Sequence, residues 1–306
     1  MAYPVAPGIP QMSGVYVPEI WSGKTLVKFY DKTVFAAISN IDYEGEIKKH
    51  GDKVIIRTIP DMTINPYVKG QKLTYATPTP ETIELLIDKG HYWAFAVNDV
   101  DEKQSDIAFV EKWTTDASEQ LGITMDTAIL ADVYADADAS NKGATAGKIS
   151  QDINLGATGT PLVVTKDNIL DIIVDLNTVF NEQSVPENDR KLVIPAWACG
   201  LIKKSDLKDA SLTGDGSSIL RNGRIGMIDR FEIFSSNNIE SVTDGADTAY
   251  NAIACQREAL TFASQLTKNE TIDNPDDFGK LNRGLQVYGY KVIKPEALIH
   301  LYIVKG

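Results

Sequence analysis

The feature that most constrains the fold is an amphipathic stretch from Asp99 to Ala135. Apolar or small side chains recur there at steps of three and four residues: Ile107, Val110, Trp113, Ala117, Leu121, Met125 and Ala128. This spacing keeps them on one face of an α-helix, whereas Glu119 and Asp126 fall mostly off that face. A helix over residues 104–135 would be about 48 Å long at 1.5 Å per residue, which is long for a globular protein. We therefore expect it to need a long partner surface, either a sheet of its own chain or neighbouring copies in an assembly.

Composition indicates a folded protein that does not bind nucleic acid tightly. At 306 residues the chain is long enough for two subdomains, because single cores stop growing at about 250 to 300 residues. Its hydrophobic content of 43% and charged content of 24% are ordinary. A net charge of −12 argues against a surface that grips phosphates, since such a surface needs clustered Lys and Arg.

The two cysteines, Cys199 and Cys255, both stand in apolar surroundings. We expect buried, reduced thiols in a protein made and kept in a cytoplasm, because disulfide frameworks use many cysteines in small secreted chains. No apolar run approaches the roughly 20 residues that span a bilayer. The sequence therefore predicts no membrane contact.

The sequence pattern of the N-terminal third predicts an arm, a short helix and a β-rich region in turn. Residues 1–20 are rich in proline and lack a helical or strand period, which predicts an extended arm that orders against something else. A short helix is expected over residues 21–39, followed by a strand over residues 52–60 and a stretch punctuated by Pro and Gly. Two β-rich runs within residues 82–97, joined at Lys89 and Gly90, predict a hairpin.

The rest of the chain alternates helices and strands without a regular rhythm. Residues 135–161 read as a connector, and residues 165–183 as a helix capped by Thr165. The elements expected after that are a buried strand over 192–202 with Pro195 at its end, a strand within 225–239, a helix over 257–270, and closing strands over 285–293 and 297–304. This irregular order predicts the α+β class.

Motifs for nucleotide and calcium binding are incomplete. Gly23 begins a GKT triplet, but a phosphate loop needs a glycine where Pro18 stands. The segment 143–148 is one residue short of that loop, and Gly214 with Gly216 does not complete a dinucleotide fingerprint. A calcium loop beginning at residue 136 would have Asn141 at its glycine position. These segments are therefore expected to be solvated loops and ordinary turns.

Metal and catalytic constellations are also missing from the sequence pattern. His50, His91 and His300 lie far apart, and there is no CxxC pair and no GxSxG elbow. We therefore predict no catalytic, cofactor-binding or metal-binding residues. The chain is expected not to be an enzyme.

Several segments, taken in order, resemble one known family. They are residues 18–40, 43–60, 87–105, 192–202, 220–239, 257–266 and 285–298. Together they are similar to the major capsid proteins of tailed bacteriophages with the Hong Kong 97-type fold, in the branch close to the coat proteins of podovirus-like phages. The resemblance covers nearly the whole chain, although there is no room for the large inserted domain of the longest relatives.

The resemblance implies a division of the chain into five parts. Residues 1–45 would form the N-terminal arm and short helix, and residues 46–98 an extended β-hairpin loop that lies across an adjacent subunit. Residues 99–162 would form the peripheral domain with its spine helix and connector. Residues 163–254 would form the mixed axial domain, and residues 255–306 would close the body.

The resemblance also implies a function in assembly. Copies of the chain would build hexamers and pentamers of an icosahedral head that encloses double-stranded DNA without sequence-specific binding. Portal, scaffolding and decoration proteins are further candidate partners, and no cofactor is implied. The protein would be assembled in the host bacterial cytoplasm and reside in the virion. The alternatives are the shell protein of an encapsulin-like nanocompartment or, further away, a soluble α+β enzyme.

Overall fold

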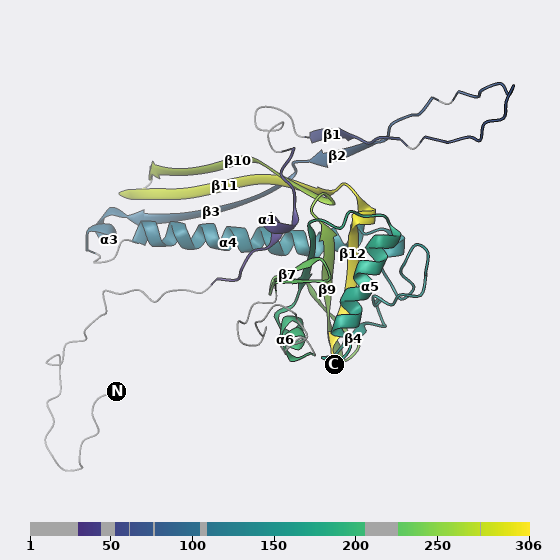
Figure 1. Ribbon diagram of the computed structural model, residues 1–306. Helices are drawn as coiled ribbons and strands as arrows, with labels where there is room; N and C mark the ends of the chain where they lie inside the picture. Colours follow the sequence, from purple (N-terminus) through teal and green to yellow (C-terminus); the bar gives the residue numbers. More distant parts are fainter. Residues whose placement is uncertain are drawn as a thin grey trace, which may run out of the picture.

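A long helix beside a narrow sheet forms one half of the molecule, and a wider sheet with its own helices forms the other (Figure 1). The computed structural model describes residues 30–43, 53–60, 62–75, 77–104, 109–205, 226–275 and 277–306. We call the half built from β3, α3, α4, β10 and β11 the elongated unit, and the half built from β4 to β9, α5, α6 and β12 the compact unit. A two-stranded ribbon, β1 and β2, carries an extended loop away from both units.

The elongated unit is an antiparallel sheet with α4 along one face. The sheet has the order β10-β11-β3, with β3 at Lys89–Asn98, β10 at Leu260–Asp273 and β11 at Gly279–Val292. Trp113 of α4 meets Phe95 of β3 edge-on, with ring centroids 5.5 Å apart. The sheet thus supplies the long partner surface that the sequence predicted.

The predicted long helix is confirmed for most of its length. Helix α4 spans Phe109–Asp132 and leads into the 3-10 turn η1, Val133–Asp136. The shorter helix α3, Asp99–Gln104, precedes it, and residues 105–108 lie outside the described part of the chain.

The predicted facing of this helix is correct at Met125, which is buried, and wrong at Asp126, which was predicted to lie off the apolar face and is fully buried. Trp113 faces the sheet as predicted, where its ring meets Phe95, but it is 45% exposed. The physical reason is that the covering changes along the helix. Helix α1, Phe35–Ile38, and the main core enclose its C-terminal half, whereas the sheet covers its N-terminal half from one side.

The predicted helix over residues 257–270 is wrong, because this segment forms strand β10. Its register with β11 runs from Leu260↔Val292 to Asp273↔Lys280, with an irregularity between Ser264 and Leu266. Local helical spacing is a weak prior, and a long partner strand overrides it.

The predicted hairpin within residues 82–97 is also wrong. Strand β2, Thr82–Leu86, pairs with β1, Lys53–Arg57, whereas β3 pairs with β11. Lys89 and Gly90, expected to form the turn, are the first residues of β3. The chain passes from one sheet to another at this point, and two adjacent β-rich runs cannot distinguish this from a hairpin.

The compact unit is built on a mixed sheet in the order β4-β12-β9-β5-β7-β6, with β8 paired to β9. Its strands are β4 Leu162–Val164, β5 Arg190–Ile194, β6 Met227–Ile228, β7 Phe231–Ser235, β8 Ser241–Asp244, β9 Asp247–Gln256 and β12 Leu298–Lys305. The closing strands predicted in β11 and β12 are confirmed. Strands β9 and β12 are buried along most of their length, so this sheet forms the centre of the main core.

Helix α5, Ile169–Glu182, confirms the predicted amphipathic helix. Its buried side chains are Ile169, Ile172, Ile173, Leu176, Val179 and Phe180. The predicted cap is wrong: Thr165 donates its backbone N–H to Oδ1 of Asn168 at 2.7 Å, and Asn168 is the residue that precedes the helix. Pro195 ends strand β5 as predicted, but the residues after it form helix α6, Ala196–Lys204, and do not continue the strand.

The remaining predictions have mixed outcomes. Residues 30–34 are not helical, so the described part of the predicted first helix is only α1, Phe35–Ile38, and residues 1–29 lie outside the described part. The connector contains η2, Ala139–Asn141, and contributes Ala146 and Leu155 to the core. Cys199 and Cys255 are buried and free, as expected. Within the described ranges, no helix is long and apolar enough to cross a bilayer.

Candidate assembly surfaces

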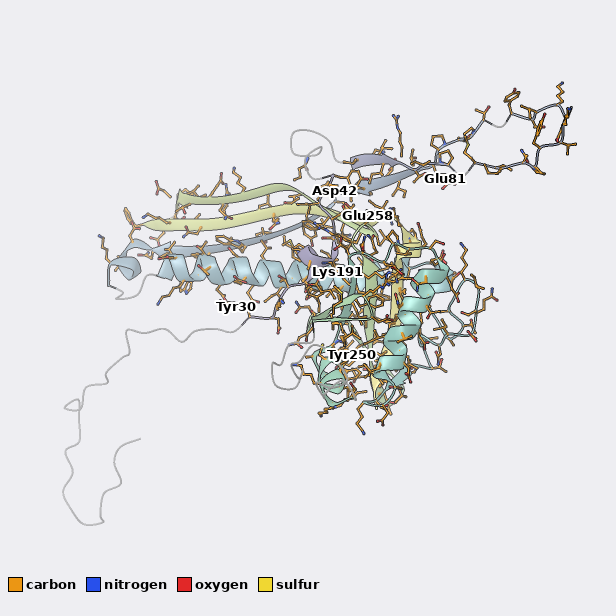
Figure 2. The ribbon with its side chains drawn as sticks, viewed as in Figure 1. Tyr30, Asp42, Glu81, Lys191, Tyr250 and Glu258 are labelled. Carbon is orange, nitrogen blue, oxygen red and sulfur yellow. The ribbon has the colours of Figure 1, made fainter. Side chains whose placement is uncertain are left out.

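Residues 58–81, which we call the extended loop, connect β1 to β2 and stand clear of both units (Figure 1). Apolar side chains along the described part of the loop are between 57% and 95% exposed: Ile59, Met62, Ile64, Tyr67, Val68, Leu73 and Tyr75. Figure 2 shows the loop side chains pointing outward, beyond Glu81 where the chain returns to the ribbon. So much exposed apolar surface on one segment marks a contact surface for another molecule.

The root of the loop is fixed on the elongated sheet by a small core of its own. Its buried members are Val54, Ile56, Leu85, Ile87 and Ala263, from the ribbon, the chain after β2, and β10. The ribbon also crosses β11 closely at a glycine, since a Cβ on Gly289 would lie 1.9 Å from the carbonyl oxygen of Leu86. The extended loop therefore projects from a rigid base, which the ribbon and the elongated sheet form together.

Replacing Gly289 by Val should displace this base. The backbone of Leu86 cannot yield without loosening the small core, so we expect a loss of about 2 kcal/mol or more in the free energy of unfolding. Urea denaturation measures it. Gly200→Ala is the matched control, because a Cβ there meets no atom within 4 Å and the helix α6 favours alanine. Equal stability of the Gly289→Val variant and the wild type would contradict the assignment.

A buried carboxylate joins three parts of the molecule, and we call this contact the Asp126 junction. Oδ1 of Asp126 accepts the backbone N–H groups of Val34 and Phe35 at 3.0 and 2.8 Å, and Oδ2 accepts from Nδ2 of Asn238 at 2.7 Å. It therefore satisfies the N-terminus of α1, whose first N–H groups have no partner within the helix. The junction ties the N-terminal segment and the compact unit to α4.

Sequence reasoning missed this junction, although a signal was present. Asp126 lies between Met125 and the buried pair Ile129 and Leu130, at helical steps that place it beside the apolar face. A charged residue at such a position, with no lysine or arginine one turn away, indicates a buried hydrogen-bond acceptor.

A second polar network lies where η1 meets the compact sheet. The Nε2–H of His300 donates to Oδ1 of Asn251 at 2.9 Å, and Nδ2 of Asn251 donates to Oε2 of Glu240 at 2.8 Å. The ring of Tyr134 lies 4.7 Å from that of His300. Burial lowers the pKa of His300 to about 4, with a smaller contribution from Lys142. His300 is therefore a neutral, partly buried residue of strand β12.

This histidine should make the subunit less stable in acid. The unfolded chain binds the proton with a pKa near 6.5 and the folded chain with a pKa of about 4. The stability contribution is thus complete above about pH 6.5 and is lost as the pH falls toward 4. Thermal melts of the unassembled subunit between pH 7 and pH 4.5 measure this slope. His300→Gln keeps a hydrogen-bond donor but cannot titrate, so the stability of this variant should fall less steeply with pH. Equal slopes for the variant and the wild type would rule out His300 as the cause of the acid sensitivity.

The other residues weighed as metal ligands are used within the protein or lie apart. Asp136 forms an ion pair with Lys291 at 3.0 Å, and Oδ1 of Asp138 accepts from the backbone N–H of Ser140 at 2.8 Å. His91 lies on β3 and His300 on β12. Among the residues that the structure describes, no three His, Cys, Asp or Glu side chains are grouped to hold a metal ion. Residues 18–25, His50 and residues 214–216 lie outside the described part of the chain.

The comparison with known families decides between the classes that this architecture leaves open. A family model described as phage capsid protein matches residues 81–301, which is well over half of the chain. The chain belongs to the phage capsid protein family. A comparison with curated proteins finds no match.

Solved structures match the chain over nearly its whole length. A structure from Mycobacterium phage Che8 covers 94% of this chain and 97% of its own, with 26% sequence identity and a TM-score of 0.76. The capsid of the cyanophage P-SCSP1u covers 95% and 94%, with 16% identity and a TM-score of 0.72. The mature capsid of bacteriophage PhiM1 covers 93% and 91%, with 15% identity and a TM-score of 0.70.

These matches confirm the predicted Hong Kong 97-type fold and the predicted class of function. The chain is a major capsid protein, a structural component of the phage virion and not an enzyme. They give no support to the alternatives, a nanocompartment shell protein or a soluble enzyme. The assignment to the podovirus-coat-like branch is not tested by these matches and remains a prediction.

Proposed function

We propose that this capsid protein assembles into hexamers and pentamers of an icosahedral head that encloses double-stranded DNA. The observation that carries the proposal is the extended loop, whose apolar side chains are exposed in the isolated chain. In a closed shell each copy engages its neighbours several times, so weak contacts add up to a stable particle. The net charge of −12 suits a wall that repels phosphates and lets DNA move during filling.

The proposal assigns roles to the parts of the chain. Helix α4 would be the spine of the peripheral domain, and the compact unit would supply most of the axial domain near the capsomer centre. In sequence, the proposed division is residues 1–45 for the arm and short helix, 46–98 for the segment that contains the extended loop, 99–162 for the peripheral domain with its connector, 163–254 for the axial domain and 255–306 for the closing segment. The loop would lie on an adjacent copy, which also makes it the main contact between subunits.

Particle size tests the proposal directly. The purified 306-residue chain should form particles of many megadaltons, which light scattering separates readily from a small oligomer and electron microscopy identifies as closed shells. A chain that stays monomeric at high concentration would contradict it. The portal, scaffolding and decoration proteins of the same phage are the further predicted partners. Producing each of them together with this chain in the bacterial cytoplasm, where we expect assembly, should change the yield or the uniformity of the particles.

A further inference from the structure

A cavity of about 310 Å³ opens at the root of the extended loop, and we call it the root cavity. It lies where the ribbon, the end of α4 with η1, and β11 come together. Its charged lining consists of Glu84, Asp88, Lys89, Asp132, Asp136 and Lys291, and Tyr290 also lines it. Leu86, Val133 and Val292 add an apolar part to the wall. The root cavity therefore combines a charged lining with apolar surface.

The lining has four carboxylates and two lysines, and one of the carboxylates, Glu84, pairs with Lys53 outside the lining at 2.9 Å. One carboxylate is therefore in excess, and both lysines of the lining are already engaged. Lys291 pairs with Asp136 at 3.0 Å, and Nζ of Lys89 lies 4.8 Å from the ring centroid of Tyr290. The hydroxyl of Tyr290 donates to Oδ2 of Asp132 at 3.0 Å. Among the described residues, Asp88 has no hydrogen bond or ion pair, so the root cavity has acceptor capacity left for an added cation.

The chemistry of the wall matches a lysine side chain. Such a side chain has an apolar stem of four carbons and a charged end, and it buries the stem along apolar surface while the charge reaches polar groups. Leu86 and Val292 offer apolar surface to the stem, and Asp88 and Asp132 offer oxygens to the ammonium group. Burial and the hydrogen bond to Asp132 raise the pKa of Tyr290, so this phenol keeps the proton that it donates to Asp132.

The same chain displays unpaired lysines at the far end of its loop. A turn there is closed by the backbone N–H of Gln71, which donates to the carbonyl of Val68 at 3.0 Å, with Gly70 at a φ of +88°. Lys69 lies in this turn and Lys72 directly follows it; both are exposed, and within the described ranges neither forms an ion pair. Because the loop projects away from its own root (Figure 1), these lysines cannot reach the root cavity of their own chain.

We infer that the root cavity of one copy binds the lysines at the loop tip of a second copy. This inference rests on the proposed assembly and names the site that receives the loop. The contact joins two different patches, so each copy can give one loop and receive another. Such a head-to-tail contact closes into a ring when the rotation between copies is right, which is the geometry of a capsomer.

Coupling of amines to carboxylates in assembled wild-type particles tests the inference. Light and ¹⁵N-labelled subunits are mixed before assembly, treated with a zero-length carbodiimide, digested and analysed by mass spectrometry. The expected product is a mixed-isotope peptide that joins Lys69 or Lys72 to Asp88, Asp132 or Glu84. Particles that couple the tip lysines to other segments only, or not at all, would overturn the inference and leave the proposed function intact. A chain that stays monomeric would contradict both the inference and the proposed function.

Charge exchange provides an independent readout. Lys69→Glu combined with Lys72→Glu should raise the protein concentration at which particles form at least tenfold, because the tip would then repel the root cavity. Adding Asp88→Lys should restore most of the loss. Lys166→Glu is the control, since it changes an exposed lysine that lies before α5 and outside the loop, and it should leave assembly unchanged. Normal assembly of the tip variant, or no recovery with Asp88→Lys, would overturn the inference.

Discussion

Replacing Ile59, Ile64, Tyr67 and Tyr75 together by serine should abolish particle formation and leave the subunit folded. Each of these side chains is between 70% and 95% exposed in the chain, so its loss removes almost no contact from the subunit. Changes at such surface positions usually alter stability by less than about 0.5 kcal/mol. The melting temperature of the unassembled protein should therefore stay within a few degrees of the wild type.

Assembly should respond in the opposite way. Full burial of a side chain of this size contributes about 1.5 to 3 kcal/mol, and four of them act on every copy. A loss of about 4 kcal/mol per contact raises the protein concentration needed for association about 1000-fold. Light scattering across a concentration series measures the threshold. The control is Val174→Ser, an exposed apolar residue on α5 that lies outside the loop.

Two outcomes would contradict the role given to the loop. One is normal assembly of the fourfold variant, which would mean that the exposed side chains contact nothing in the particle. The other is loss of the folded subunit, which would mean that they support the chain itself. A variant that folds but assembles only at much higher concentration is the expected result, and it would locate the main contact between copies on this loop.

The elements that sequence reasoning predicted correctly are those with a strong local pattern. Helix α5 presents Ile172, Ile173 and Leu176 to the core at helical steps, and strand β12 is an apolar run bounded by a turn. In both cases the local spacing and the final burial agree. Pro195 also marked a true boundary, because proline removes a donor from the sheet and ends the strand.

The two wrong strand assignments share one cause, which is that local spacing does not show which strand a segment pairs with. Strand β10 has helical spacing in its sequence, but its partner β11 fixes it as a strand over its whole length. Lys89 and Gly90 resembled a hairpin turn, but β3 finds its partner almost 200 residues later in the chain. No local pattern contains this information, so the order of strands in either sheet could not be predicted.

Among the candidate assembly surfaces and contacts, the one with a local sequence pattern was predictable and those formed by distant segments were not. The extended loop was predictable, because proline and glycine between residues 60 and 80 prevent regular structure. The root cavity was not, since it needs the ribbon, α4 and β11 to meet. The Asp126 junction was missed because a charged residue in an amphipathic helix is normally solvated, and the polar groups that Asp126 satisfies lie about 90 and 110 residues away.

The Asp126 junction should be the most sensitive single position for the stability of the subunit. Asp126→Ala leaves two backbone N–H groups and one amide without their acceptor at a fully buried position. Removing one partner of a buried hydrogen-bonded charge costs about 3 to 5 kcal/mol. The attachment of α1 should loosen first, because its N-terminus loses its cap. Urea denaturation and hydrogen exchange at Val34 and Phe35 measure both effects.

Two variants separate the hydrogen bonds from the charge. Asp126→Asn keeps the acceptor for the two N–H groups but sets its amide against that of Asn238, so it should lose less stability than Asp126→Ala. Adding Asn238→Asp to this variant gives the new amide at position 126 a carboxylate acceptor at position 238, so it should recover part of the lost stability. Glu119→Ala, an exposed acid on the same helix, should change stability by less than about 0.5 kcal/mol. If Asp126→Ala were no more damaging than Glu119→Ala, the junction would not hold the N-terminal segment and the compact unit to the spine helix.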